Sequence, residues 1–155
     1  FWRNTSGAYA LWSLNSSGIQ TGWRYVGMSE VLGLETQYGV DINGDTTIGL
    51  SFTSLGVRLG TVEVGTTQLG YALRVSGGTP LQVTYSGGYA SASNPGGGWT
   101  GIAGRTVGSG YEFFWRNTSG AYALWSLNSS GIQTGWRYVG MSEVLGLETQ
   151  YGVDI

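Results

Sequence analysis

The chain lacks cysteine, histidine and lysine altogether, and these absences remove most catalytic chemistry. Without histidine and cysteine there is no Ser-His or Cys-His nucleophile, no thiolate and no zinc site of the usual kind. Without lysine there is no Schiff base and no Walker-type phosphate loop. Paired carboxylates remain formally possible, but pairing cannot be read from sequence. We therefore expect a protein that is not an enzyme.

Charge is scarce as well, at 10% of the residues, with a formal net charge of -2. The positive charges are seven arginines spread singly along the chain, whereas phosphate binding needs clustered cations. We therefore expect no nucleic-acid partner. No apolar run approaches the roughly 20 residues that a membrane-spanning helix requires. Glycine and aromatic residues are abundant instead, and so many aromatic side chains with so little charge argue against disorder.

One stretch of the sequence occurs twice without a change. Residues Phe1–Ile42 and Phe114–Ile155 are identical, which gives a period of 113 residues. We expect residues 1–113 to form one full repeat module, and residues 114–155 to be a partial second copy that belongs to, or pairs with, the adjacent module. Both ends cut through an expected strand or motif, which predicts a slice of a longer tandem array. An engineered domain closed by duplicated strands explains the identity equally well.

The pattern of residues predicts short strands joined by turns. Strands are expected over residues 9–14 and 19–26, and the short turn between them implies an antiparallel meander. A helix of two to three turns is expected to begin with Ser29 as its N-cap and to end at Gly39. Alternating runs between residues 50 and 117 predict further strands. The expected fold is mainly β, an antiparallel β-sandwich or meander of about eight short strands with one short helix per repeat.

A candidate metal site follows the expected helix. Asp41, Asn43 and Asp45 place oxygen side chains at alternate positions, and Thr47 can add a backbone carbonyl, as in a calcium loop. No acid stands at position 12 of that loop, so another acid, such as Glu35 of the expected helix, would have to complete the ligand shell. The same residues would serve Mg²⁺, or an Asx-rich turn that holds no metal. Ca²⁺ is therefore one of three interpretations.

The aromatic residues form the second candidate site. Large aromatics fill cores and contacts between modules, because they combine area with a polar handle, and we favour this interpretation. An exposed row of the same rings would instead stack on sugars. The candidate interface residues are Trp2, Trp12, Trp23, Trp99, Trp115, Trp125 and Trp136.

Several of these motifs together resemble a known family. They are the Phe-Trp-Arg-Asn and Tyr-Ala-Leu-Trp-Ser-Leu-Asn strands within residues 1–15, and the Asp-Ile-Asn-Gly-Asp turn at 41–45. The combination resembles the tryptophan-rich tandem-repeat module of large secreted or surface-attached bacterial proteins, notably cyanobacterial ones, which often carry calcium repeats. That family usually has Gly where this chain has Thr46. The resemblance implies an extracellular structural or adhesive repeat.

Together these patterns predict a non-catalytic module of an extracellular bacterial surface filament or giant adhesin. The expected partners are identical neighbouring repeats, joined head to tail through strand pairing and aromatic contacts. A carbohydrate-binding module that recognises surface glycans is the alternative.

Overall fold

The computed structural model describes residues 1–155, and it is mainly β, with antiparallel sheets and two helices. The chain divides into two compact units, Phe1–Ser51 (unit 1) and Phe52–Ile155 (unit 2). This division differs from the period of the sequence, which separates residues 1–113 from residues 114–155. The second copy of the repeated stretch therefore shares a unit with the residues that precede it, Phe52–Phe113, here called the partner segment.

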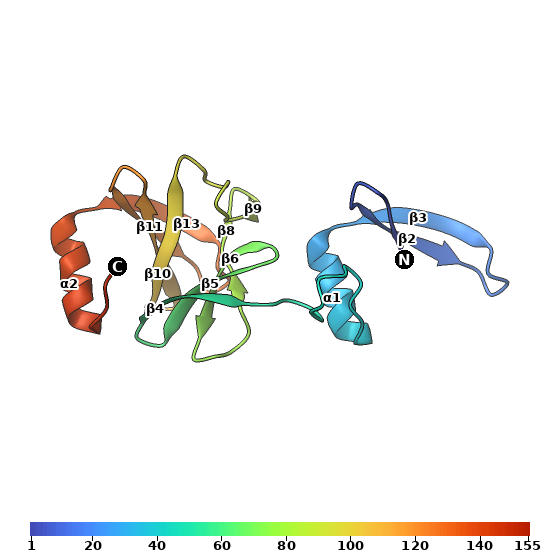
Figure 1. Ribbon diagram of the computed structural model, residues 1–155, viewed down its shortest axis with the longest axis horizontal. Coiled ribbons are helices and arrows are strands. Elements are labelled where there is room, and N and C mark those ends of the chain that lie inside the picture. The colour runs from blue at the N-terminus through green and yellow to red at the C-terminus, as the bar shows by residue number, and fades with distance from the viewer. The chain divides into compact units, whose positions relative to one another are not determined.

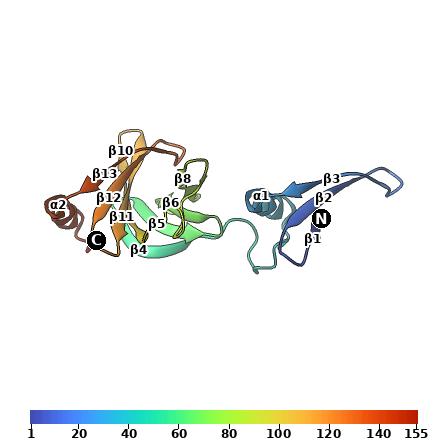
Figure 2. The ribbon, with the colours of Figure 1, turned by 90° about the horizontal axis from the view of Figure 1, so that it is seen from above.

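Unit 1 is a three-stranded antiparallel sheet followed by a helix (Figures 1 and 2). Its elements are β1 (Trp2–Arg3), β2 (Tyr9–Leu14), β3 (Gln20–Val26) and α1 (Met28–Tyr38). The turn between β2 and β3 is held by Asn15, whose side chain accepts the backbone N–H groups of Ser17 and Ile19. Gly18 supplies the positive φ of 76° that this turn requires. The expected meander and helix are thus confirmed.

The ends of α1 agree with the sequence at one terminus and differ at the other. Gly39 ends the helix in the left-handed conformation and donates its N–H to the carbonyl of Glu35, as predicted. The predicted N-cap, Ser29, is wrong. Gly27 is the N-cap, no side chain caps the helix, and Ser29 lies inside the first turn. Gly27 has an extended backbone and is the single residue between the end of β3 and the start of α1, so the chain passes directly from strand to helix.

Unit 2 contains two four-stranded antiparallel sheets, a two-stranded ribbon and a helix (Figure 1). The first sheet has the order β4-β5-β6-β7, with strands Thr53–Leu59, Val62–Thr67, Gly70–Val75 and Leu81–Gln82. The second has the order β10-β11-β12-β13, with strands Trp99–Val107, Gly110–Asn117, Tyr122–Leu127 and Gln133–Val139. The ribbon is β8 (Thr84–Tyr85) with β9 (Gly88–Tyr89), and the helix is α2 (Met141–Tyr151).

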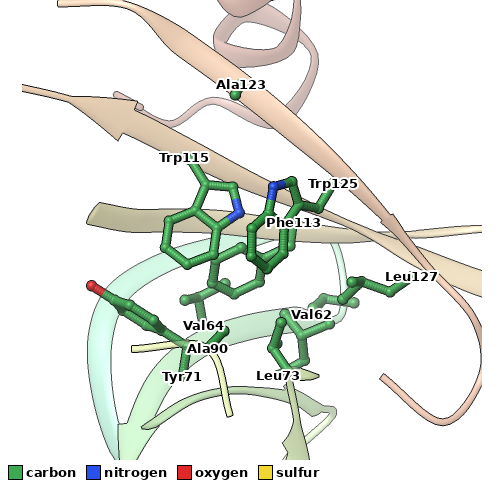
Figure 3. Packing of buried hydrophobic residues seen from close by; sticks show 11 residues of the cluster. Val62, Val64, Tyr71, Leu73, Ala90, Phe113, Trp115, Ala123, Trp125 and Leu127 are labelled. Atoms are coloured by element: carbon green, nitrogen blue, oxygen red, sulfur yellow. The ribbon is translucent and has the colours of Figure 1, made fainter. Parts of the chain in front are cut away.

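The two four-stranded sheets of unit 2 share a core. Successive side chains of β11 point to opposite faces, so Phe113 and Trp115 meet the first sheet while Phe114 points away from it. Figure 3 shows Trp115, Trp125 and Phe113 gathered over side chains of β5 and β6. The ring centroids of Trp115 and Trp125 lie 4.6 Å apart, and Tyr71 meets Trp115 edge-on at 5.2 Å. The expected sandwich of antiparallel sheets is present.

A second layer of packing covers the opposite face of the β10–β13 sheet. There Phe114 and Leu124 are buried with Val144 and Leu147 of α2. Leu59, at the end of β4, joins the same cluster. Unit 2 therefore has three layers: sheet, sheet and helix. Neither helix of the chain is long and apolar enough to cross a membrane.

The two identical stretches adopt the same local structure. Strands β12 and β13 and helix α2 reproduce β2, β3 and α1, each displaced by one period. The strand register is the same, including the irregularity at Ser13/Leu14 and at Ser126/Leu127. The local sequence is therefore sufficient to define a hairpin followed by a helix, whatever covers it.

The surroundings of the two copies differ sharply. The side chain of Trp2 is 56% exposed, whereas Trp115, the same residue one period later, is 1% exposed. Trp12 is 41% exposed and Trp125 is 6% exposed. In unit 2 the partner segment covers these rings, whereas in unit 1 no such segment covers them.

This difference predicts unequal costs for the same substitution. Trp125→Ala should destabilise unit 2 by about 3–5 kcal/mol, because it empties a packed core position. Trp12→Ala should cost unit 1 about 1 kcal/mol or less, since it removes a half-exposed ring stacked on Trp2. Urea unfolding of both variants measures the two costs. Equal losses would contradict the assigned surroundings.

Candidate functional site

The principal candidate site of unit 1 is one face of its sheet, here called the tryptophan face. Trp12 lies directly opposite Trp23 on the neighbouring strand, which places both rings on the same side. Trp2 stacks on Trp12 with ring centroids 4.6 Å apart, and Tyr25 meets Trp23 edge-on at 5.1 Å. All four rings are exposed. An exposed apolar surface of this kind marks a contact or binding site.

The predicted interface tryptophans fall into two groups. In unit 2, Trp115 and Trp125 are buried against the partner segment, so their equivalents Trp2 and Trp12 are the part of the face that the partner segment can cover. Trp136 is 60% exposed and its equivalent Trp23 is 57% exposed, so this position stays open in both units. Trp99 is half-buried and belongs to the partner segment.

Unit 2 also has an aromatic pocket of about 220 Å³. It lies where Trp136 and Tyr138 of β13 extend past the buried tryptophans toward Trp99, whose ring centroid is 6.3 Å from that of Tyr138. The complete lining is Tyr85, Pro95, Trp99, Trp115, Ala123, Trp125, Trp136 and Tyr138. Its side chains carry no formal charge, so it suits an uncharged ligand with apolar faces.

In each unit an ion pair ties a β-strand to the helix, on the face of the sheet opposite the tryptophans. Arg24 of β3 makes a two-bond pair with Glu30 in the first turn of α1, and Arg137 makes the same pair with Glu143. The arginine hydrogen bonds lower the pKa of Glu30 and of Glu143 below the usual range. Both carboxylates also lie at a helix N-terminus, where negative charge is favourable. The pair helps to fix the angle at which each helix leaves its sheet.

The predicted metal residues lie together in the loop Asp41–Thr47, here called the acidic loop. The side-chain oxygens of Asp41, Asn43 and Asp45 all accept hydrogen bonds from backbone N–H groups of the same loop. These bonds join Asp41 to Gly44 and Thr46, Asn43 to Asp45, and Asp45 to Thr47, with lengths of 2.6–2.9 Å. The arrangement is that of successive Asx turns, one of the interpretations that the sequence leaves open.

The fit of a cation to the acidic loop depends on redirecting these oxygens. Nowhere in the chain do three acidic side chains converge as a metal-ligating group. Asn43 also donates its side-chain N–H to Asp45 at 3.1 Å, which directs a donor into the loop. A bound Ca²⁺ would have to share the remaining lone pairs of Asp41 and Asp45 and draw on backbone carbonyls such as that of Thr47. Calcium at this loop stays a prediction.

Glu35 has a role that the sequence did not reveal. Its side chain is fully buried, and it accepts the backbone N–H groups of Ile42, Asn43 and Gly49 at 2.9–3.0 Å. It therefore fastens the acidic loop onto the helix and is not placed as a third acid beside Asp41 and Asp45. The sequence suggested Glu35 as a metal ligand for this loop and did not indicate its role as an acceptor, because the bonds go to backbone atoms.

Glu148, the equivalent residue in the second copy, is differently placed. It accepts the N–H of Ile155 at 3.0 Å and is partly exposed. Leu145 beside it is 53% exposed, whereas Leu32 in unit 1 is 3% exposed beneath residues 43–51. The face of α1 that carries Leu32 is thus covered in unit 1, whereas the equivalent face of α2, which carries Leu145, is open in unit 2. The sheets show the reverse, because the first two tryptophans of the copy are exposed in unit 1 and buried in unit 2.

This contrast predicts the effect of removing each carboxyl group. Glu35→Gln should destabilise unit 1 by about 2–3 kcal/mol, because the amide offers one acceptor oxygen and sets a donor against buried N–H groups. Glu148→Gln should cost unit 2 about 1 kcal/mol or less. Urea unfolding compares the matched pair, and a larger loss in Glu148→Gln would refute the role assigned to Glu35.

Comparison with protein-family models, with curated protein sequences and with solved structures finds no match to this chain.

Proposed function

We propose that this chain is a non-catalytic structural repeat of an extracellular bacterial surface filament or giant adhesin. In this proposal the modules join head to tail through strand pairing and aromatic contacts. The surface location rests on the resemblance carried by the tryptophan-rich strands and the Asp-Ile-Asn-Gly-Asp turn of residues 41–45. Assembly is supported by the different surroundings of the two copies.

One observation supports assembly above all others. The same 42-residue sequence folds twice, and two of its three tryptophans are buried where the partner segment is present and exposed where it is not. A sequence that carries a large apolar face in both positions is adapted to being covered. In a perfectly periodic array each copy would have a partner segment before it, and a contact that repeats in this way without closing produces a filament.

Electron microscopy of a chain of several consecutive 113-residue periods tests this function. We expect a linear row of equal particles with one particle per period, because each copy would be covered by the segment before it. Separate, irregular particles would contradict the proposal.

The same preparation tests the calcium prediction. If Ca²⁺ holds the acidic loop, a chelator should disrupt the row, and Asp41→Asn with Asp45→Asn should remove the response. A row that survives chelation unchanged would show that calcium has no part in assembly. Calorimetric titration of the present chain with Ca²⁺ gives the binding itself.

Glycan binding is the second candidate, and the aromatic pocket of unit 2 favours it. Trp136, Tyr138 and Trp99 are at the surface in this pocket, and uncharged rings of this kind stack on the apolar faces of sugars. Unit 1 offers a matched control, because Trp23 has the same sequence surroundings as Trp136 but lacks the partner segment that completes the pocket.

A glycan array followed by tryptophan-fluorescence titration measures this activity. Trp136→Ala should weaken sugar binding about tenfold, as expected for the loss of one stacking ring, while Trp23→Ala should leave it unchanged. Equal losses in the two variants would place any binding outside the pocket, and no binding to any glycan would eliminate this candidate.

A further inference from the structure

We propose that unit 1 is a receptor for residues 52–113 of a neighbouring repeat, which bind its tryptophan face and the free edge of β1. The proposal rests on the proposed function and adds the identity of the partner and the register of the contact. The neighbouring segment would occupy the position that Phe52–Phe113 occupies in unit 2.

The edge of the sheet shows where the contact begins. In unit 2 strand β11 lies between β10 and β12, and its residues Phe114 and Trp115 pair with Ala103 and Gly101 of β10. In unit 1 the equivalent strand β1 has β2 as its one neighbour. Its outer edge is therefore unpaired, with exposed apolar side chains beside it, a combination that recruits another strand.

Identity of sequence fixes the register. Phe1 and Trp2 are the residues that stand one period before Phe114 and Trp115. A β10 strand from a neighbouring repeat would therefore place Ala103 opposite Phe1 and Gly101 opposite Trp2. Glycine is required at position 101 because the space around it is filled in unit 2, where a Cβ atom on Gly101 would come within 2.5 Å of the ring of Phe113. A crowded position of this kind disfavours a shifted register.

Unit 2 shows which surface is complementary to the tryptophan face beside this edge. In unit 2 Trp115 and Trp125 pack against Tyr71, Leu73 and Val64 of the partner segment. Trp2 and Trp12 already stack at the same centroid distance of 4.6 Å as that buried pair. The face of unit 1 is thus largely preorganised for the same contact, which reduces the entropy lost on binding.

Stoichiometry decides which partner can cover the face. Each chain holds two copies of the 42-residue stretch and one partner segment. Suppose that the first copy of one chain displaced the second copy of another chain from its partner segment. One tryptophan face would then be covered and an identical one would be exposed, so the exchange would gain no buried contact. The occupant is therefore an additional partner segment, contributed by a neighbouring repeat, and a second molecule of this chain cannot fully replace it.

Hydrogen exchange read by mass spectrometry tests this inference on the chain itself. Peptides that span Tyr9–Leu14 or Tyr122–Leu127 have the same mass, because the two sequences are identical. The present chain should give a bimodal envelope with equal slow and fast populations. The slow population comes from the buried copy and the fast one from the open copy.

A lengthened chain supplies the missing partner. When residues 52–113 are placed before Phe1, so that Phe113 precedes Phe1 as it precedes Phe114, the envelope should collapse to one slow population. Trp12→Ala should then lower the unfolding temperature as much as Trp125→Ala, although it has a smaller effect in the present chain. An envelope that stays bimodal, with Trp12→Ala still mild, would overturn the inference.

Three further outcomes are informative, and the last two separate this inference from the filament proposal. A unimodal envelope in the present chain, together with a dimer in analytical ultracentrifugation, would mean that two tryptophan faces cover each other, and would overturn the inference. A covered face in the lengthened chain without a linear row in longer arrays would support the inference while refuting the filament. A linear row in longer arrays, together with an envelope that stays bimodal in the lengthened chain, would support the filament while refuting the inference.

Discussion

The burial of two stacked tryptophans against a second sheet is the interaction on which unit 2 depends. Trp115 and Trp125 have almost no exposed surface, and they lie between the two four-stranded sheets with Phe113 and Tyr71. Large aromatic rings contribute more buried area than any other side chains, so this group provides much of the driving force that joins the sheets. Unit 1 has the same two rings and no second sheet, which leaves it with an open apolar face.

The repeated stretch is best understood as a segment with two docking sides. Its sheet takes the partner segment, as unit 2 shows, and its helix takes the residues that follow it, as Glu35 and the buried Leu32 of unit 1 show. Each copy in this chain has one of the two covers. A complete module therefore combines a partner segment, the 42-residue stretch and a following loop, and the boundary between the compact units at Ser51/Phe52 agrees with that order. This is a physical reason why the unit boundary and the sequence period do not coincide.

The aromatic residues are divided between structure and candidate recognition by their place in the sheet. Trp125 and Trp136 are directly opposite each other on neighbouring strands, yet one is buried and the other exposed, because side chains of the β4–β7 sheet pack on Trp125 and not on Trp136. The exposed one, with Tyr138 and Trp99, remains available to a ligand in the aromatic pocket. A single surface can thus serve packing in its centre and binding at its margin.

The amino-acid sequence was enough to predict the hairpin, the helix and the end of the helix at Gly39, because these depend on turn residues and on alternation within a few positions. It also determined the identity of the two copies and the mainly β class. The three-dimensional structure was needed to show which copy is covered, where the compact units divide, and that Glu35 holds the acidic loop. These depend on contacts between residues far apart in the chain, and identical local sequences cannot encode different surroundings. Two pairs of tryptophans show this directly: Trp2 and Trp12 lie at the surface of unit 1, whereas Trp115 and Trp125, with the same local structure, lie in the core of unit 2.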